Sequence, residues 1–293
     1  MTAVTPTVTL KPSGGLRRRR IVNRIMEIIG WAAALAAVAV LFIVIISVLV
    51  RAWPALSWDF LTKPPALFGP GGGISSAIVG SAIIVAMATA LALPIGVLIG
   101  IYLTEFAPRR VARPVQLVLD VLNGLPTIIT GIFVYGLLVI GHGQSAYAGA
   151  FALAIVMLPL VARSAQETLL LVPSALREGS LALGVSRWRS VIGVILPTTL
   201  GGILTGAVLA VARAAGETAP LLFTCSIFNP AVSTDVTKAV PNIPVLIFTY
   251  SEQPDQALHE QAWGAALVLM VFVLVSSLLA KALLARSRRK LGR

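Results

Sequence analysis

The segment EGSLALG at residues 178–184, followed after nine residues by VILP at 194–197, decides the fold of this chain. The first part predicts a short amphipathic helix that stops at its second glycine. Arg187 and Arg189 then form a basic turn, and Pro197 is suited to the first turn of the next helix. A charged, glycine-interrupted segment of this kind is typical of a loop between two helices at a membrane surface.

Apolar runs on both sides of this loop are long enough to cross a membrane. The chain has 293 residues, of which 57% are hydrophobic and only 12% are charged, whereas soluble domains carry roughly 25% charged residues. A span needs about 20 apolar residues, and it must be helical because lipid cannot satisfy exposed backbone groups. We therefore expect an all-α membrane protein with about six transmembrane helices. The expected spans lie at about 28–50, 76–103, 114–140, 146–172, 197–224 and 262–285.

These spans leave room for one membrane domain and two short tails. We expect basic cytoplasmic tails at 1–27 and 286–293 around a single transmembrane domain at 28–285, whose loop at about 174–196 faces the cytoplasm. Of the 23 Lys and Arg residues, 18 fall on the side of the N-terminus, three on the opposite side and two within spans. Because cytoplasmic loops carry the excess of positive charge, both termini are predicted to be cytoplasmic.

Two charged residues fall deep inside the fifth expected span. Arg213 lies 16 residues after Pro197, which is roughly 24 Å along a helix, and a charge at that depth costs on the order of 2.5–3.5 kcal/mol. Glu217 follows four residues later, so both side chains are expected on one side of the helix. We expect them to line a substrate path; the alternative is a structural ion pair that only locks helices together.

Arg163 lies nearer the cytoplasmic end of its span, where it either joins the same path or extends toward the membrane surface. Two arginines that reach one cavity offer planar forks suited to a tetrahedral oxyanion, which favours phosphate or sulfate over a neutral sugar. Breaks at Gly124, Pro126, Thr127 and Gly131 predict irregular helix that lines the path. Glycine is also common at ordinary helix contacts.

The sequence argues against several other kinds of protein. Its net charge of +12 comes from clusters of Lys and Arg between apolar runs, a distribution that marks the sides of a membrane protein rather than a nucleic-acid-binding surface. One cysteine, Cys225, excludes a disulfide framework and a multi-cysteine metal site. We expect no catalytic residue, no metal ligands and no bound cofactor. Because the sequence has no Gly-Lys-Ser or Gly-Lys-Thr phosphate loop, the energy for any transport must come from a partner chain.

The opening segment resembles the Glu-Ala-Ala loop of binding-protein-dependent ABC importers. Gly179 and Ser180 replace its two alanines, and Val194 stands where isoleucine is usual. The resemblance implies that this loop docks on a cytoplasmic ATPase and transmits closure of the nucleotide-bound dimer to the spans. The residues implied in ATPase coupling are Glu178, Gly179, Ser180, Gly184, Arg187, Arg189, Leu196 and Pro197.

From the second span onward, the chain resembles the phosphate-specific transport permeases of the PstA family. The resemblance rests on residues 123–136, on Leu158-Pro159 with Arg163, on the coupling loop and on residues 212–222. It implies a type I ABC importer fold in the bacterial inner membrane and functional charges at Arg213, Glu217 and Arg163.

The same resemblance implies four partners besides membrane lipid: the sister permease PstC, a dimer of the ATPase PstB that binds ATP and Mg, the extracytoplasmic phosphate-binding protein PstS, and phosphate. Three alternatives remain open. The chain is a permease for sulfate, molybdate or phosphonate, or it is the sister permease itself, or, more distantly, it is an ion-coupled secondary carrier.

Overall fold

The computed structural model of the protein describes residues 14–66, 71–227, 229 and 231–291. Regular structure in these residues is helical, apart from one isolated bridge between Pro65 and Gly72. Five helices are long and apolar enough to cross a membrane, and a bent pair of helices forms a sixth span if it is counted as one. The expectation of an all-α membrane protein with about six transmembrane helices is confirmed.

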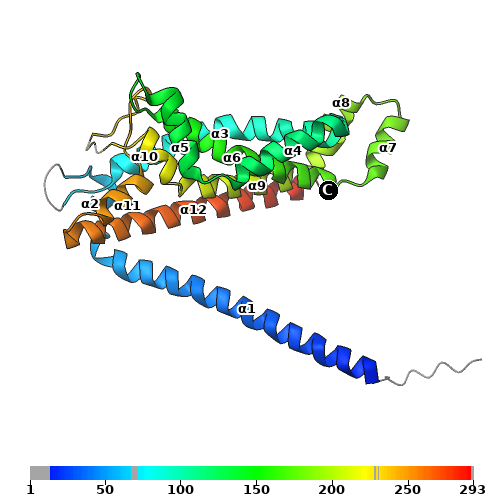
Figure 1. Ribbon diagram of the computed structural model, residues 1–293, viewed down its shortest axis with the longest axis horizontal. Helices are drawn as coiled ribbons and strands as arrows, with labels where there is room; N and C mark the ends of the chain where they lie inside the picture. The colour runs from blue at the N-terminus through cyan, green and yellow to red at the C-terminus, as the bar shows by residue number, and fades with distance from the viewer. Residues whose placement is uncertain (1–13, 67–70, 228, 230, 292–293) are drawn as a thin grey trace, which may run out of the picture. The chain divides into compact units, whose positions relative to one another are not determined.

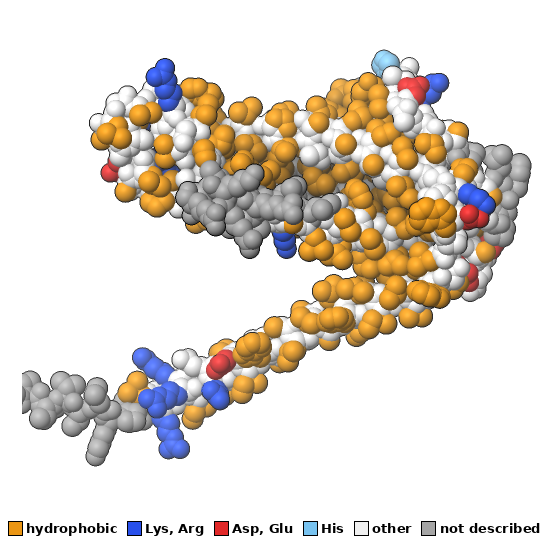
Figure 2. Space-filling model, turned by 180° about the vertical axis from the view of Figure 1, so that it is seen from behind, with side chains coloured by type: hydrophobic (Ala, Val, Ile, Leu, Met, Phe, Trp, Pro, Cys, Tyr) orange, Lys and Arg blue, Asp and Glu red, His pale blue; other side chains and the backbone are white. Residues whose placement is uncertain are grey.

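The chain divides into two units, residues 1–50 and 51–293. Helix α1 (Gly14–Ala52) makes up the described part of the first unit and has 39 residues, so it is about 58 Å long and exceeds a hydrocarbon core of about 30 Å. Five of its arginines, at positions 17–20 and 24, gather near the N-terminal end, Arg51 lies in the last turn, and apolar side chains cover most of the rest (Figure 2). The first helix therefore begins inside the segment that was expected to be a tail.

The second unit is built around α6 (Ala146–Leu170), which lies between α3 (Ser75–Ile101) and α9 (Leu196–Ala215) (Figure 1). Helix α12 (Gln256–Leu291) packs along α9. The shorter elements are η1 (Trp53–Ala55), α2 (Trp58–Thr62), η2 (Tyr102–Phe106), α4 (Arg109–Gly124), α5 (Thr127–Val134), η3 (Tyr135–Val139), α7 (Ser174–Ala182), α8 (Arg187–Ser190), η4 (Val191–Ile195), α10 (Ala219–Thr224) and α11 (Ile243–Ser251).

Glycines set the close packing of α6 against both neighbours. On α3, a Cβ atom added to Gly96 would lie 2.8 Å from the Cβ of Val161 on α6. On α9, a Cβ atom added to Gly206 would overlap the side chain of Ser164. Small residues allow helix backbones to approach closely in a membrane, where no hydrophobic effect drives helices together. Gly206 therefore sets the spacing of α6 and α9, the two helices that carry the intramembrane arginines.

The third expected span is not one straight helix. Helices α4 and α5 meet at an angle of 99° across a short break, at the position where Gly124 and Pro126 predicted irregular helix within the span at 114–140. Leu125 is extended, with φ −69° and ψ 134°, because the residue before a proline is driven out of the helical region. Pro126 also lacks the N–H that a continuous helix would need.

The fifth expected span begins earlier and ends earlier than 197–224. One helical run extends from Arg187 to Ala215, and it passes through the π-helical turn η4 before it reaches Pro197. A π turn locally shifts the backbone hydrogen-bond partners, so Pro197 sits within the helical run and does not start it. The run stops at Gly216, and α10 follows as a separate short helix.

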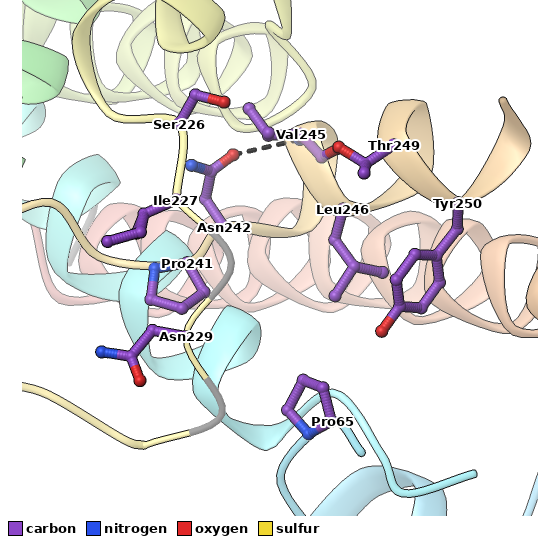
Figure 3. Close-up of a pocket in the computed structure, with 10 residues that line it drawn as sticks. All are labelled: Pro65, Ser226, Ile227, Asn229, Pro241, Asn242, Val245, Leu246, Thr249 and Tyr250. Carbon is purple, nitrogen blue, oxygen red and sulfur yellow. Dashed lines mark hydrogen bonds between the residues drawn. The ribbon is translucent and has the colours of Figure 1, made fainter. Parts of the chain in front are cut away.

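The outer segment expected as a loop, 225–261, is partly buried and contains α11. Val240 is fully buried, and the amide of Asn242 donates to the carbonyl oxygen of Cys225 at 2.8 Å. The backbone N–H of Ile243 donates to the hydroxyl of Ser81 on α3 at 2.8 Å. Figure 3 shows Asn242 beside a pocket of about 190 Å³, which is lined by residues of this segment, α11 included, and by Pro65. These contacts tie the segment to the helical core.

Candidate functional site

A groove of about 660 Å³ opens between α4, α6 and α9. Its apolar walls carry several charged and polar side chains, and both predicted intramembrane arginines line it. The structure therefore brings Arg163 and Arg213 to one cavity. The lining residues are Asp120, Asn123, Pro159, Leu160, Arg163, Ser164, Glu167, Gly206, Leu209, Ala210 and Arg213.

Arg163 on α6 is paired inside the groove. One terminal guanidinium nitrogen, Nη2, donates to Oδ1 of Asp120 on α4 at 2.6 Å, and the other, Nη1, donates to Oε1 of Gln166 at 3.3 Å. Gln166 is buried, whereas the side chains of Arg163 and Asp120 are 39% and 52% exposed in the isolated chain. Both terminal nitrogens of Arg163 are thus hydrogen-bonded to side chains of this chain. The Arg163 and Asp120 side chains nevertheless remain open to the groove.

Arg213 stands in the last turn of α9, where its Nε lies 3.5 Å from Oε1 of Glu217. The helix has already ended at this point, and the N–H of Glu217 donates to the carbonyl oxygen of Ala214 at 3.1 Å. This turn keeps the carboxylate beside the arginine. The Arg213 side chain is 50% exposed and that of Glu217 only 16%, so the arginine projects into the groove while its partner is packed against the chain.

The four other residues expected along the path lie around the bend between α4 and α5. Gly124 and Pro126 are exposed and Thr127 is half-buried at the break itself. Gly131 is buried, and an added Cβ would lie 2.8 Å from the Cα of Pro220 on α10. A close contact between α5 and α10 thus explains why residue 131 is a glycine. Next to the bend, it is Asn123 that lines the groove.

The expected coupling loop forms two short helices joined by a turn. Gly184 between α7 and α8 has φ +76°, a left-handed conformation that glycine adopts without strain. Glu178, Gly179, Arg187 and Arg189 are exposed. Their exposure leaves one face of the loop free to contact another protein.

The inner side of the same loop is fastened to the helices. The hydroxyls of Ser180 on α7 and Ser190 on α8 lie 2.5 Å apart and are both buried. Leu196 and Pro197, also expected to act in coupling, are half-buried within the run that includes α9. These four residues belong to the attachment of the loop and not to its exposed face.

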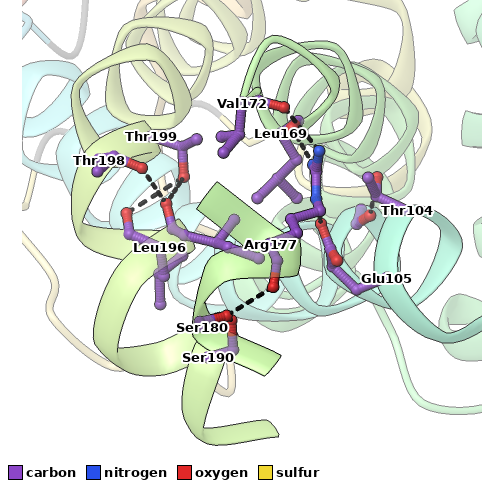
Figure 4. A network of polar contacts seen from close by, with 12 residues as sticks. Thr104, Glu105, Leu169, Val172, Arg177, Ser180, Ser190, Leu196, Thr198 and Thr199 are labelled. Atoms are coloured by element: carbon purple, nitrogen blue, oxygen red, sulfur yellow. Dashed lines mark hydrogen bonds and ion pairs between the residues drawn. The ribbon is translucent and has the colours of Figure 1, made fainter. Parts of the chain in front are cut away.

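Arg177 on α7 makes several polar contacts between this loop and the membrane helices (Figure 4). Its Nε donates to Oε1 of Glu105, at the end of the α3–η2 run, at 3.0 Å. Its two terminal nitrogens donate to the carbonyl oxygens of Val172 at 2.6 Å and Leu169 at 2.7 Å, where α6 ends. One side chain therefore joins α7 to both α3 and α6.

The match to known sequences covers the groove and the coupling loop together. Residues 92–291 match the family described as binding-protein-dependent transport system inner membrane component. The chain belongs to this permease family. Its members are subunits of ABC importers, so this permease is a multi-pass protein of the inner membrane that works with an ATPase and a substrate-binding protein.

Curated relatives of this permease are similar over most of their length. The phosphate transport system permease protein PstA of Yersinia pestis is 36% identical, with 92% of each chain covered. A protein of Mycobacterium tuberculosis strain H37Rv named phosphate transport system permease protein PstA 1 is 34% identical over 94% of this chain and 92% of that one. The expected resemblance to PstA permeases is confirmed.

Solved structures confirm the expected type of fold. This permease superposes on a chain of the inward-facing methionine ABC transporter MetNI with a TM-score of 0.60, at 18% identity, over 73% of this chain and 97% of that one. A bacterial alginate ABC transporter, solved with an alginate pentasaccharide-bound periplasmic protein, gives a TM-score of 0.63 at 14% identity over 90% and 93% of the two chains. At these identities the likeness concerns the fold alone.

Three charged residues of this permease escaped the sequence analysis. Asp120 carried a usable signal, because a lone carboxylate within an apolar run is a functional candidate by default. Glu105 and Arg177 gave none, because both lie close to expected span ends, where charged residues are ordinary. Only the folded chain brings them within 3.0 Å of each other.

Proposed function

We propose that this permease moves inorganic phosphate into the cell as one half of the pathway of an ATP-driven importer. The observation that carries the proposal is the groove lined by both Arg163 and Arg213. Guanidinium groups bind the oxygens of phosphate through paired, charge-assisted hydrogen bonds. The names of the curated relatives support phosphate as the substrate.

The groove suits passage better than tight capture. Each arginine has a carboxylate nearby, Asp120 for Arg163 and Glu217 for Arg213. The positive charges lower the electrostatic barrier for an anion, and the carboxylates keep the empty groove from becoming a permanent trap. A carrier that bound phosphate too strongly would release it slowly, so carboxylates that neutralise the arginines of the empty groove favour transport.

Transport in this proposal is driven from outside the chain. The exposed face of α7 and α8 docks on the ATPase PstB, which binds ATP and Mg and hydrolyses the nucleotide, and PstC supplies the other half of the pathway. PstS delivers phosphate at the outer mouth. The sequence of this permease has no Gly-Lys-Ser or Gly-Lys-Thr loop with which to hold nucleotide phosphates, so it performs no bond chemistry itself.

The proposed topology places α7, α8 and both termini in the cytoplasm. It rests on the excess of Lys and Arg on that side of the expected spans. Phosphate then enters beside α10 and α11, passes Arg213 and Arg163, and leaves near the coupling loop as the subunits alternate between outward and inward opening.

The test is uptake of labelled phosphate by cells that carry the intact chain or the Arg213→Ala variant, with equal amounts of protein in the membrane. We expect uptake to fall by roughly 10-fold or more, because a hydrogen bond to a charged group contributes about 1.5–3 kcal/mol. Lys238→Ala is the matched control, since Lys238 pairs with Asp235 on the exposed outer segment. Wild-type uptake by Arg213→Ala would refute the role of the arginine.

Another oxyanion is the second candidate, because an arginine fork binds tetrahedral oxyanions in general. Excess sulfate, molybdate or phosphonate in the same assay distinguishes these substrates. Phosphate uptake that ignores sulfate supports the proposal, and competition by one of the other anions would reassign the substrate.

A further inference from the structure

We propose that Asp120 is an internal counter-anion, which occupies Arg163 while the groove is empty and which phosphate must displace. This inference rests on the proposed function and adds a residue whose charge sets how firmly the substrate is held. It starts from the pairing of Asp120 Oδ1 with Arg163 Nη2 at 2.6 Å across the groove.

The pair competes directly with a substrate for the same atoms. An oxyanion bound in two-point fashion uses two N–H groups of one guanidinium, and in the empty groove Nη2 serves Asp120 and Nη1 serves Gln166. Phosphate can take the fork only after the carboxylate moves away. The apparent affinity for phosphate is then the affinity of an unoccupied Arg163 multiplied by the fraction of time for which Asp120 is away.

The location of Asp120 indicates why it can move. It lies four residues before Gly124, at which α4 ends, next to the 99° bend between α4 and α5. Leu119 is the one buried α4 residue among those described, and it packs against Leu103 and Ala162. The carboxylate is near the end of a helix that has one buried residue among those described, whereas Arg163 is on the central helix α6, which has many.

The charges of the groove support displacement rather than simple attraction. Its two arginines face Asp120 and Glu167 among the lining residues, and Arg213 has Glu217 nearby as well. The empty groove therefore carries no net positive charge. A phosphate anion gains strong electrostatic attraction only where it replaces a carboxylate, and Asp120 is the carboxylate in direct contact with Arg163.

The test is equilibrium binding of labelled inorganic phosphate to the purified complex of this permease with its partner chains, without the binding protein. Asp120→Asn removes the charge and keeps an oxygen that accepts a hydrogen bond from Arg163, so α4 stays in place. We expect Asp120→Asn to bind phosphate about three- to tenfold more tightly than the wild type, and to show a lower maximal uptake rate because release is slower.

If the ion pair were merely structural, its loss would weaken phosphate binding or leave it unchanged, and would not tighten it. Arg163→Gln combined with Asp120→Asn should abolish the gain, and Asp59→Asn, which removes an exposed pair with Lys63 outside the groove, should behave as wild type. If Asp120→Asn is not recovered from the membrane, Asp120→Ser carries the same expectation. The inference is overturned if Asp120→Asn and Asp120→Ser bind phosphate no more tightly than the wild type. A wild-type complex that takes up no phosphate overturns the proposed function instead.

Discussion

Arg177 on α7 and Glu105 at the end of the α3–η2 run form an ion pair of 3.0 Å, and only 7% of the Glu105 side chain is exposed. The same arginine also holds the last carbonyl groups of α6, where a positive charge is favoured by the helix dipole. We therefore expect movement of α7 to be passed through this one side chain to the helix that carries Arg163 and to its neighbour α3.

Glu105→Gln should uncouple the ATPase from transport. The change leaves Arg177 without its buried counter-charge, which we expect to lower the free energy of unfolding by about 1–3 kcal/mol and to loosen α7 against α3. In proteoliposomes that hold the complete transporter, we expect phosphate moved per ATP hydrolysed to fall several-fold while ATP hydrolysis continues. An unchanged ratio in Glu105→Gln would show that the pair transmits nothing.

Gly206→Ala should push α9 away from α6 and separate the two arginines. The added methyl group would overlap the Ser164 side chain, and overpacking of a well-packed interior costs about 1–3 kcal/mol. We expect a lower melting temperature in detergent and a loss of uptake. Gly136→Ala is the control, because an added Cβ there has no atom within 4 Å among the described residues, and equal effects of both variants would contradict this account.

The sequence predicts the spans well because burial in lipid imposes one simple condition, a run of apolar residues. It also predicts that Arg163 and Arg213 matter, since a charge inside such a run is costly. What it does not predict is the partner of each arginine. Glu217 follows Arg213 along the chain, but Asp120 meets Arg163 only because α4 packs against α6.

Breaks in the helices were only partly predictable. Pro126 marks the bend after α4 correctly, because it follows an Asn-Gly pair that ends a helix readily. Pro197 looks like an equally clear helix start, yet the π turn before it lets the helix pass through. The buried outer segment around Asn242 has no periodic pattern, so its packing against Ser81 could not be inferred.

Leu183→Asp should weaken the association of this permease with its ATPase. Leu183 directly follows α7 and is 85% exposed, and Leu181 and Trp188 of the same loop are also exposed. A group of exposed apolar side chains favours a site where another protein docks. We expect less ATPase to co-purify with the variant and uptake to fall in proportion. Val232→Asp changes an exposed apolar residue of the outer segment and should leave the association intact, and equal loss in both variants would argue against docking at α7.

The sides of the membrane can be assigned with single cysteines, because Cys225 is the one native cysteine and is fully buried. Its Sγ is hydrogen-bonded to the backbone of Val240, so the wild type should react little with a maleimide that cannot cross membranes. Ala231 and Ser186 are exposed in the outer segment and the coupling loop respectively. We expect Ala231→Cys to be labelled in intact cells and Ser186→Cys only after the inner membrane is permeabilised. The reverse pattern would invert the topology, and with it the direction in which phosphate passes Arg213 and Arg163.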